Sequence, residues 1–242
     1  MSLAILRLLH LADSAFPIGA AAHSFGLETL TAEGTLTPQS LHTFLRDFLW
    51  ETGRVEAIFG RLAYRCAVQN DQQAWVAQWL GLNTYIAALK PARESRDASA
   101  TLGRRFLQTV AHLEATPCLR QAQDTAQQAA IDIHYCVAFG LVGGALQLGE
   151  EATTVAYLQQ SLMGLVSACL RLLPMGQGRA GEILWGIKPL IDEVATASRA
   201  SLPVDETTID LTHYMNRLTT FTPMLDLASM RHPTLPTRLF IS

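Results

Sequence analysis

Charge is scarce in this sequence. Of its 242 residues, 16% are Asp, Glu, Lys or Arg, compared with about 25% in an ordinary soluble domain. Roughly twenty charged side chains are missing relative to that average, close to the ~20 to 30 residues that one partner contributes to a standard interface. Two interpretations stay open: a surface partly covered by other proteins, or an alanine-rich surface made of short polar side chains.

Other features are also absent, and each absence excludes a class of protein. A net charge of −3 without a long run of Lys or Arg argues against nucleic-acid binding. The four cysteines are far apart and form no Cys-x-x-Cys pair, which favours reduced thiols in a cytoplasmic protein over a disulfide framework. The first residues lack the basic leader and cleavage site of a secretory signal. The longest uncharged window, residues 152–170, contains Thr, Gln and Ser, so it predicts a buried or interface helix and no membrane span.

What is present is a series of helical patterns. The clearest is "TPQSLHTFLRDFLWETG", where Thr37 can cap a helix, Pro38 can occupy its first position, and the apolar residues that follow share one face. No stretch alternates apolar and polar residues convincingly enough to predict a strand. A Gln- and Ala-rich connection is expected at 120–130. Further helices are expected at about 54–69, 71–89, 93–114, 131–147, 151–173, 178–200 and 206–221.

These patterns predict an all-α protein, a single-domain helical bundle of about eight to ten helices. The helical body is expected over residues 1–222. Residues 223–242 contain three prolines, together with large apolar side chains that include Leu225, Leu227, Met230, Leu235, Leu239 and Phe240. This composition predicts an irregular, apolar tail. We call residues 223–242 the tail.

The sequence offers no convincing catalytic or cofactor site. "GQGRAG" at 176–181 matches a dinucleotide-binding pattern, but the preceding residues are helical in pattern, so a helix stop with Gly176 as C-cap is the preferred interpretation. No two of the seven histidines stand three or four residues apart, so no metal site is expected, and only His23 and His232 are candidate ligands. Ser24 is expected to cap a helix that has Glu28 in its first turn, at the positive end, and Gly34 after its end.

A segment rich in arginine, "ARESRDASATLGRR", leaves two interpretations open. Arg93 and Asp97 are spaced to pair on a solvated helix face, which requires no function. The same arginines could instead be polar anchors within an interface, where arginine is over-represented.

Four segments together resemble the UreF family of urease accessory proteins. They are "LLHLADSAFPIGAAAHSFGLE", "ARESRDASATLG", "RLLPMGQGRAGEIL" and "DLASMRHPTLPTRLFIS". They occur in the family's order and span nearly the whole chain. Ala21, Ala22 and Pro233 depart from the family's pattern, which puts contacts made through those three side chains in doubt.

The resemblance implies a non-catalytic scaffold for nickel insertion into urease. Such a scaffold is a homodimer that binds a D- or H-type accessory protein, recruits the nickel-carrying G-type GTPase and presents it to apo-urease. Nickel and GTP then belong chiefly to the GTPase, and this chain binds no cofactor. The partner-binding residues carried over are Pro17, Gly19, His23, Ser24, Gly26, Leu27, Glu28, Arg93, Glu94, Arg171, Pro174, Gly176, Gln177, His232, Arg238, Leu239, Phe240 and Ser242.

Two further expectations follow for the ends of the chain. Small residues from Gly19 to Ala22 would let another backbone approach closely. Leu239 and Phe240 need an apolar cover, and we expect a partner to provide it, which would leave the tail mobile in the isolated chain. The alternatives to the scaffold are an all-helical adaptor outside nickel metabolism and a helical enzyme that uses the histidines and the glycine segment.

Overall fold

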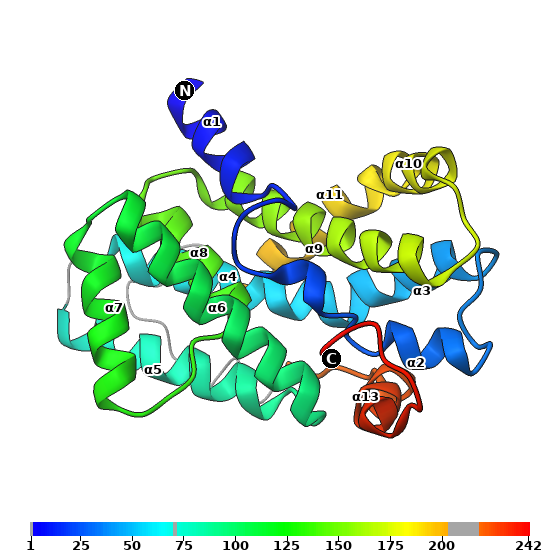
Figure 1. The fold of residues 1–242 in the computed structure, drawn as a ribbon. Coiled ribbons are helices and arrows are strands. Elements are labelled where there is room, and N and C mark those ends of the chain that lie inside the picture. The colour runs from blue at the N-terminus through cyan, green and yellow to red at the C-terminus, as the bar shows by residue number, and fades with distance from the viewer. Residues whose placement is uncertain (1, 70–71, 203–217) are drawn as a thin grey trace.

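A computed structural model describes residues 2–69, 72–202 and 218–242. Within these ranges the protein is all-α and no strand occurs, as predicted. Figure 1 shows α1 (Ser2–Leu11) projecting from the body, and α13 (Pro223–Arg231) lying beside α2 (Leu27–Ala32) near the C-terminal end.

The centre of the bundle is α8 (Tyr135–Ala145), whose residues from Tyr135 to Gly144 are all buried. A helix that is apolar on every side must be surrounded by other helices. Its closest neighbour is α4 (Arg54–Val68). A Cβ added to Gly140 would lie 1.9 Å from the carbonyl oxygen of Gly60, so glycine is required for the two backbones to meet.

The other long helices enclose this pair. They are α5 (Gln72–Ala88), α6 (Arg93–Leu113), α7 (Pro117–Gln128), α9 (Glu150–Leu172), α10 (Gln177–Gly186) and α11 (Lys188–Ala200). Arg61 of α4 links two of them to the central pair, because its buried guanidinium donates to Glu150 of α9 at 3.0 Å and to the Ala195 carbonyl of α11 at 2.9 Å.

The helices predicted at 54–69, 71–89, 93–114 and 151–173 match α4, α5, α6 and α9 to within about two residues. Other boundaries differ. The stretch at 120–130 is not a connection, because it forms most of α7 on small buried side chains such as Ala122 and Ala126. The helix expected at 178–200 is two helices that meet at Ile187.

The helix expected from Thr37 begins later and continues further. Thr37 and Ser40 form a hydrogen-bonded turn, and α3 (Leu41–Phe48) starts after it. After α3, the π-helical residues Leu49–Gly53 (η2) lead directly into α4. Most of the helix expected at 206–221 lies outside the described residues, and 218–221 are not helical.

The tail is more regular than its prolines suggest. Pro223 occupies the first turn of α13, where a missing backbone N–H costs nothing. A short 3-10 turn, η3 (His232–Thr234), follows and contains Pro233. Only the last part of the tail is extended, and it lies against the segment that precedes α2.

Candidate docking site

One buried carboxylate joins the segment near the N-terminus to the tail. Glu28, in the first turn of α2, accepts hydrogen bonds from the backbone N–H groups of Leu239 at 2.5 Å and Phe240 at 3.1 Å. Its Oε2 also lies 2.8 Å from Nε2 of His232. The sequence predicted Glu28 in the first turn of its helix, and the structure confirms this position in α2. There the carboxylate also accepts the backbone donors of the tail.

The hydrogen bonds keep this carboxylate ionised. Burial by itself would raise the pKa of Glu28, because a charged group loses solvation in the interior. The N–H of Leu239, the ring of His232 and the N–H of Phe240 outweigh burial, so the pKa of Glu28 is lower than its ordinary value. Glu28 is therefore an anionic acceptor at neutral pH, which makes its hydrogen bonds to the tail charge-assisted.

His232 extends the contact to a third helix. Its ring is fully buried, and its Nδ1 lies 2.8 Å from Oε2 of Glu94 on α6. One imidazole thus stands between carboxylates from α2 and α6 while its backbone belongs to the end of α13. The ring fixes the position at which the chain turns from α13 into the extended part of the tail.

The extended part of the tail then follows residues 22–24. The N–H of Ile241 donates to the carbonyl of Ala22 at 2.8 Å, and the N–H of Ser24 donates to the carbonyl of Ser242. The hydroxyl of Ser242 lies 2.7 Å from Nδ1 of His23. Burial, with a smaller contribution from Arg105, lowers the pKa of His23, so the ring is neutral at pH 7.

Two arginines also hold the small-residue segment. Arg105 of α6 donates to the carbonyl of Ile18 at 3.2 Å, and its guanidinium nitrogen lies 2.6 Å from where a Cβ of Gly19 would stand. Arg171 of α9 donates to the carbonyl of Ala21 at 2.9 Å and lies 4.3 Å above the ring of Phe240. The backbone that approaches this segment is the chain's own tail, and small side chains make the approach possible.

The tail is covered on one side only. Phe240 is 5% exposed, while Leu239 and Ile241 on either side of it are 52% and 69% exposed. The expectation that a partner must cover both Leu239 and Phe240 is therefore corrected: the body covers Phe240. The same contacts argue against a tail that is mobile in the isolated chain. We call Leu239 and Ile241 the exposed tail pair.

Most of the residues carried over from the resemblance meet in this contact. Pro17 precedes it on the surface. Gly26, with φ +88°, is required because an added Cβ would stand 2.8 Å from the Ser229 hydroxyl of α13. The residues brought together are Gly19, His23, Ser24, Gly26, Leu27, Glu28, Glu94, Arg171, His232, Leu239, Phe240 and Ser242.

The other residues carried over from the resemblance lie on the surface. Arg93 is exposed and pairs with Asp97 at 3.3 Å, as its spacing predicted. Pro174, Gly176 and Gln177 lie at the exposed turn between α9 and α10, and Gly176 is the N-cap of α10, which corrects its assignment as a C-cap. Arg238 is exposed. Their predicted role in partner binding stays a prediction.

The structure also corrects one assignment and adds one residue. Ser24 does not cap α2, because its hydroxyl has no hydrogen-bond partner within the described residues and Gly26 is the N-cap. Arg105 was not among the candidates. It lies in the arginine-rich segment, but nothing in the local sequence indicates which arginine reaches Ile18.

The described part of the chain offers little support for a metal site, a reactive thiol or a membrane span. There, no group of three or more His, Cys, Asp and Glu side chains could hold a metal ion. Burial raises the pKa of the thiols of Cys66 and Cys169 to about 12, so both stay protonated at neutral pH. Among the described helices, none is long and apolar enough to cross a membrane.

Comparison with known proteins gives one consistent family. The model of the family described as UreF matches residues 36–188. The urease accessory protein UreF of Nostoc sp. is 33% identical over 239 residues, which cover 98% of this chain and 95% of the relative. The protein of the same name from Methylobacterium radiotolerans is 34% identical over 244 residues, with 100% and 98% covered. That of Bacillus sp. is 30% identical over 244 residues, with 98% and 99% covered.

Proposed function

Because the chain belongs to the UreF family of urease accessory proteins, we propose that it is a scaffold for nickel insertion into apo-urease. The members of this family are accessory proteins and not enzymes. In the proposed role the chain binds a D- or H-type accessory protein and recruits the G-type GTPase, which supplies nickel and GTP. The chain works as a homodimer in the cytoplasm and carries no cofactor of its own.

The observation that supports a docking role most directly is the one-sided burial of the tail. The body fixes the tail through Glu28, Ala22 and Ser24, yet the exposed tail pair faces outward. A segment already held in one conformation loses little entropy on binding. Covering two half-exposed aliphatic side chains contributes roughly 2 to 4 kcal/mol to association.

Because the exposed tail pair and the buried Phe240 are neighbours, substitutions can test partner binding and fold stability separately. The double variant Leu239→Ala, Ile241→Ala removes exposed apolar groups only. We expect it to weaken capture of the D- or H-type partner by about tenfold or more while leaving the melting temperature unchanged. Phe240→Ala should lower the melting temperature, because that ring is buried against Arg171 and the body.

A matched control is Leu113→Ala, at the exposed end of α6, because Leu113 is about as exposed as Leu239. This control should bind the partner as the wild type does. Undiminished capture by the double variant would contradict docking through the tail. Capture of the partner with no effect on urease activation in a reconstituted system would favour an adaptor outside nickel metabolism.

A further inference from the structure

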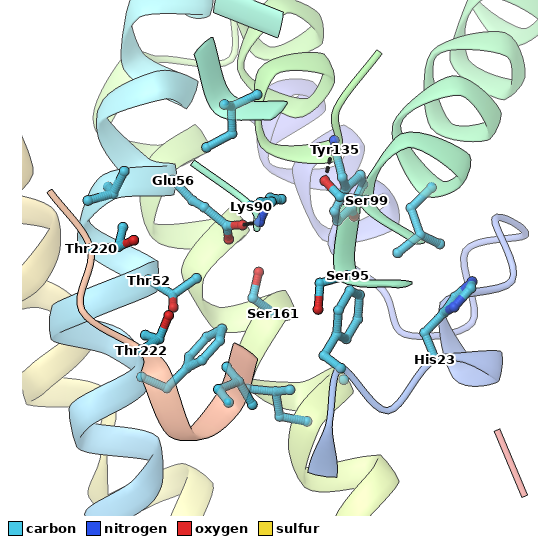
Figure 2. Close-up of a pocket in the computed structure, with 18 of the residues that line it drawn as sticks. His23, Thr52, Glu56, Lys90, Ser95, Ser99, Tyr135, Ser161, Thr220 and Thr222 are labelled. Atoms are coloured by element: carbon cyan, nitrogen blue, oxygen red, sulfur yellow. Dashed lines mark hydrogen bonds and ion pairs between the residues drawn. The ribbon is translucent and has the colours of Figure 1, made fainter. Parts of the chain in front are cut away.

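A cavity lies inside the body, beside the docking site. It holds about 120 Å³, and a cavity of roughly 150 Å³ in another protein accommodates benzene. Its walls come from η2, α4, α6, α9 and the residues that lead into α13. Figure 2 shows Glu56 and Lys90 above Ser161 and Ser95, with Thr52, Thr220 and Thr222 on one side and His23 on the other.

The walls combine apolar and hydroxyl groups. The rings of Phe25 and Phe48 and the side chains of Leu102 and Leu225 supply the apolar part. Several Ser and Thr hydroxyls supply the polar part, among them those of Thr52 and Thr220. Such a lining suits a small molecule that has both an apolar body and a polar group.

The one cation in the described wall is already neutralised. Nζ of Lys90 lies 2.5 Å from Oε1 of Glu56, and the other oxygen of Glu56 accepts a hydrogen bond from the hydroxyl of Tyr157 at 2.8 Å. Burial would lower the pKa of Lys90, but the charge and hydrogen bond of Glu56, with smaller contributions that include the charge of Asp226, outweigh burial and the pKa is raised. The ammonium group is therefore charged and engaged, which leaves no positive group for an anion.

A second carboxylate, that of Asp226, makes the net charge of the described cavity wall negative, which favours a cationic ligand. Asp226 lines the same cavity, and its Oδ2 accepts a hydrogen bond from the Thr222 hydroxyl at 3.0 Å. Its other oxygen has no hydrogen bond from any described residue. Since His23 is neutral at pH 7, the described wall carries one net negative charge: Glu56 and Asp226 against Lys90.

Gly164 leaves the cavity accessible. It lies in the interior of α9, where glycine is less favourable than alanine. Close packing does not require it, because a Cβ added there would have no atom within 4 Å, in contrast to Gly140. Gly164 is exposed and lines the cavity, so its missing side chain leaves the way from solvent open.

We propose that this cavity is a binding site for a small organic cation, an amine with an apolar body of up to about eight non-hydrogen atoms. The apolar body lies among Phe25, Phe48 and Leu225, and the ammonium group pairs with the free oxygen of Asp226. The site is separate from the docking of partner proteins on the tail.

Benzylamine and benzyl alcohol are suitable probes, because they share a shape and differ in charge. We expect benzylamine to bind the purified full-length chain with one site and a Kd of about 1 mM, and benzyl alcohol to bind at least about tenfold more weakly. Titration calorimetry measures both. Asp226→Asn keeps the acceptor for Thr222 and should remove the preference for the amine.

Gly164→Leu should abolish binding of both probes by filling the entrance, while Gly164→Ala is the matched control and should retain binding. Circular dichroism verifies that each variant keeps its helix content. Absence of saturable benzylamine binding up to about 10 mM would overturn the proposal and leave a cavity that holds water. Binding that is unchanged in both Asp226→Asn and Gly164→Leu would overturn it equally. Neither result bears on partner capture, which the exposed tail pair tests separately.

Discussion

Glu28 concentrates several roles in one side chain. It accepts two backbone N–H groups of the tail, faces His232 and stands at the start of α2. A buried carboxylate with these partners stabilises the fold only while it is ionised. Removal of its charge would leave the N–H groups of Leu239 and Phe240 without a charged acceptor.

The attachment of the tail should therefore weaken in acid. The pKa of Glu28 is lower in the folded protein than in the unfolded chain, whose ordinary value is 4.5. Its contribution to stability is fully present above that ordinary value and is lost as the pH falls through the lower, folded value. Hydrogen exchange at the amides of residues 239 and 240, followed from about pH 7 to about pH 3, should show protection lost at the acidic end.

Glu28→Gln tests the cause of that loss. The variant should be less stable than the wild type by about 1 to 3 kcal/mol at neutral pH, and the difference should disappear in acid. Urea unfolding at several pH values measures it. Glu33→Gln is the control, because Glu33 forms only a surface pair with Arg231. A constant difference across the pH range would show that the charge of Glu28 is not responsible.

At the scale of the elements, the bundle depends on how closely α4 and α8 approach. Gly60 and Gly140 let the two backbones touch, and Gly144 meets the Tyr64 carbonyl in the same way, with an added Cβ only 2.5 Å from it. Every residue of α8 from Tyr135 to Gly144 is buried, so neither helix can move aside without disturbing the layers around it.

Gly140→Ala should consequently destabilise the protein by about 2 kcal/mol or more, because overpacking forces the backbones apart. Gly164→Ala makes the same chemical change in α9 where nothing lies within 4 Å, and it should stabilise the protein by up to about 1 kcal/mol. Denaturant unfolding of the two variants measures the contrast. Equal effects would mean that the contact between α4 and α8 can relax at little cost.

Sequence patterns predicted the helices with strong periodicity, because Leu, Phe and Val repeat at helical spacing in α4 and α6. They missed α7, where alanines form the buried face and give little contrast with Gln. The same patterns predicted one helix at 178–200, where the structure has two, α10 and α11. The docking site was accessible only through the resemblance, since the hydrogen bonds of Glu28 and His23 to the tail join residues more than 200 positions apart. No local pattern indicates such pairs.

At the scale of the whole molecule, apolar side chains remain uncovered in several places. Leu6 and Leu9 of α1 are mostly exposed, and Trp185 of α10 is 76% exposed. Met224 and Leu227 of α13, in the first part of the tail, are about half exposed. Exposed apolar groups on a chain with few charges are typical of a protein that associates with others.

We expect the purified chain to self-associate, with a dimer as the main species. Sedimentation at several concentrations should give a mass twice that of one chain. Burial of apolar surface would drive this association, so it should persist in about 0.5 M salt, where ionic contacts are screened. A monomer mass that does not change with concentration would contradict the expectation, and a dimer that dissociates in salt would contradict its apolar cause.

The contact between residues 22–28 and 239–242 also has a consequence for synthesis on the ribosome. Translation proceeds from the N-terminus, so α2 and its preceding segment emerge long before the extended part of the tail that binds them. Until then the carboxylate of Glu28 has none of its backbone donors, and the exposed tail pair does not exist. A nascent or prematurely terminated chain thus lacks the surface proposed for docking, which restricts partner capture to chains whose translation has reached the tail.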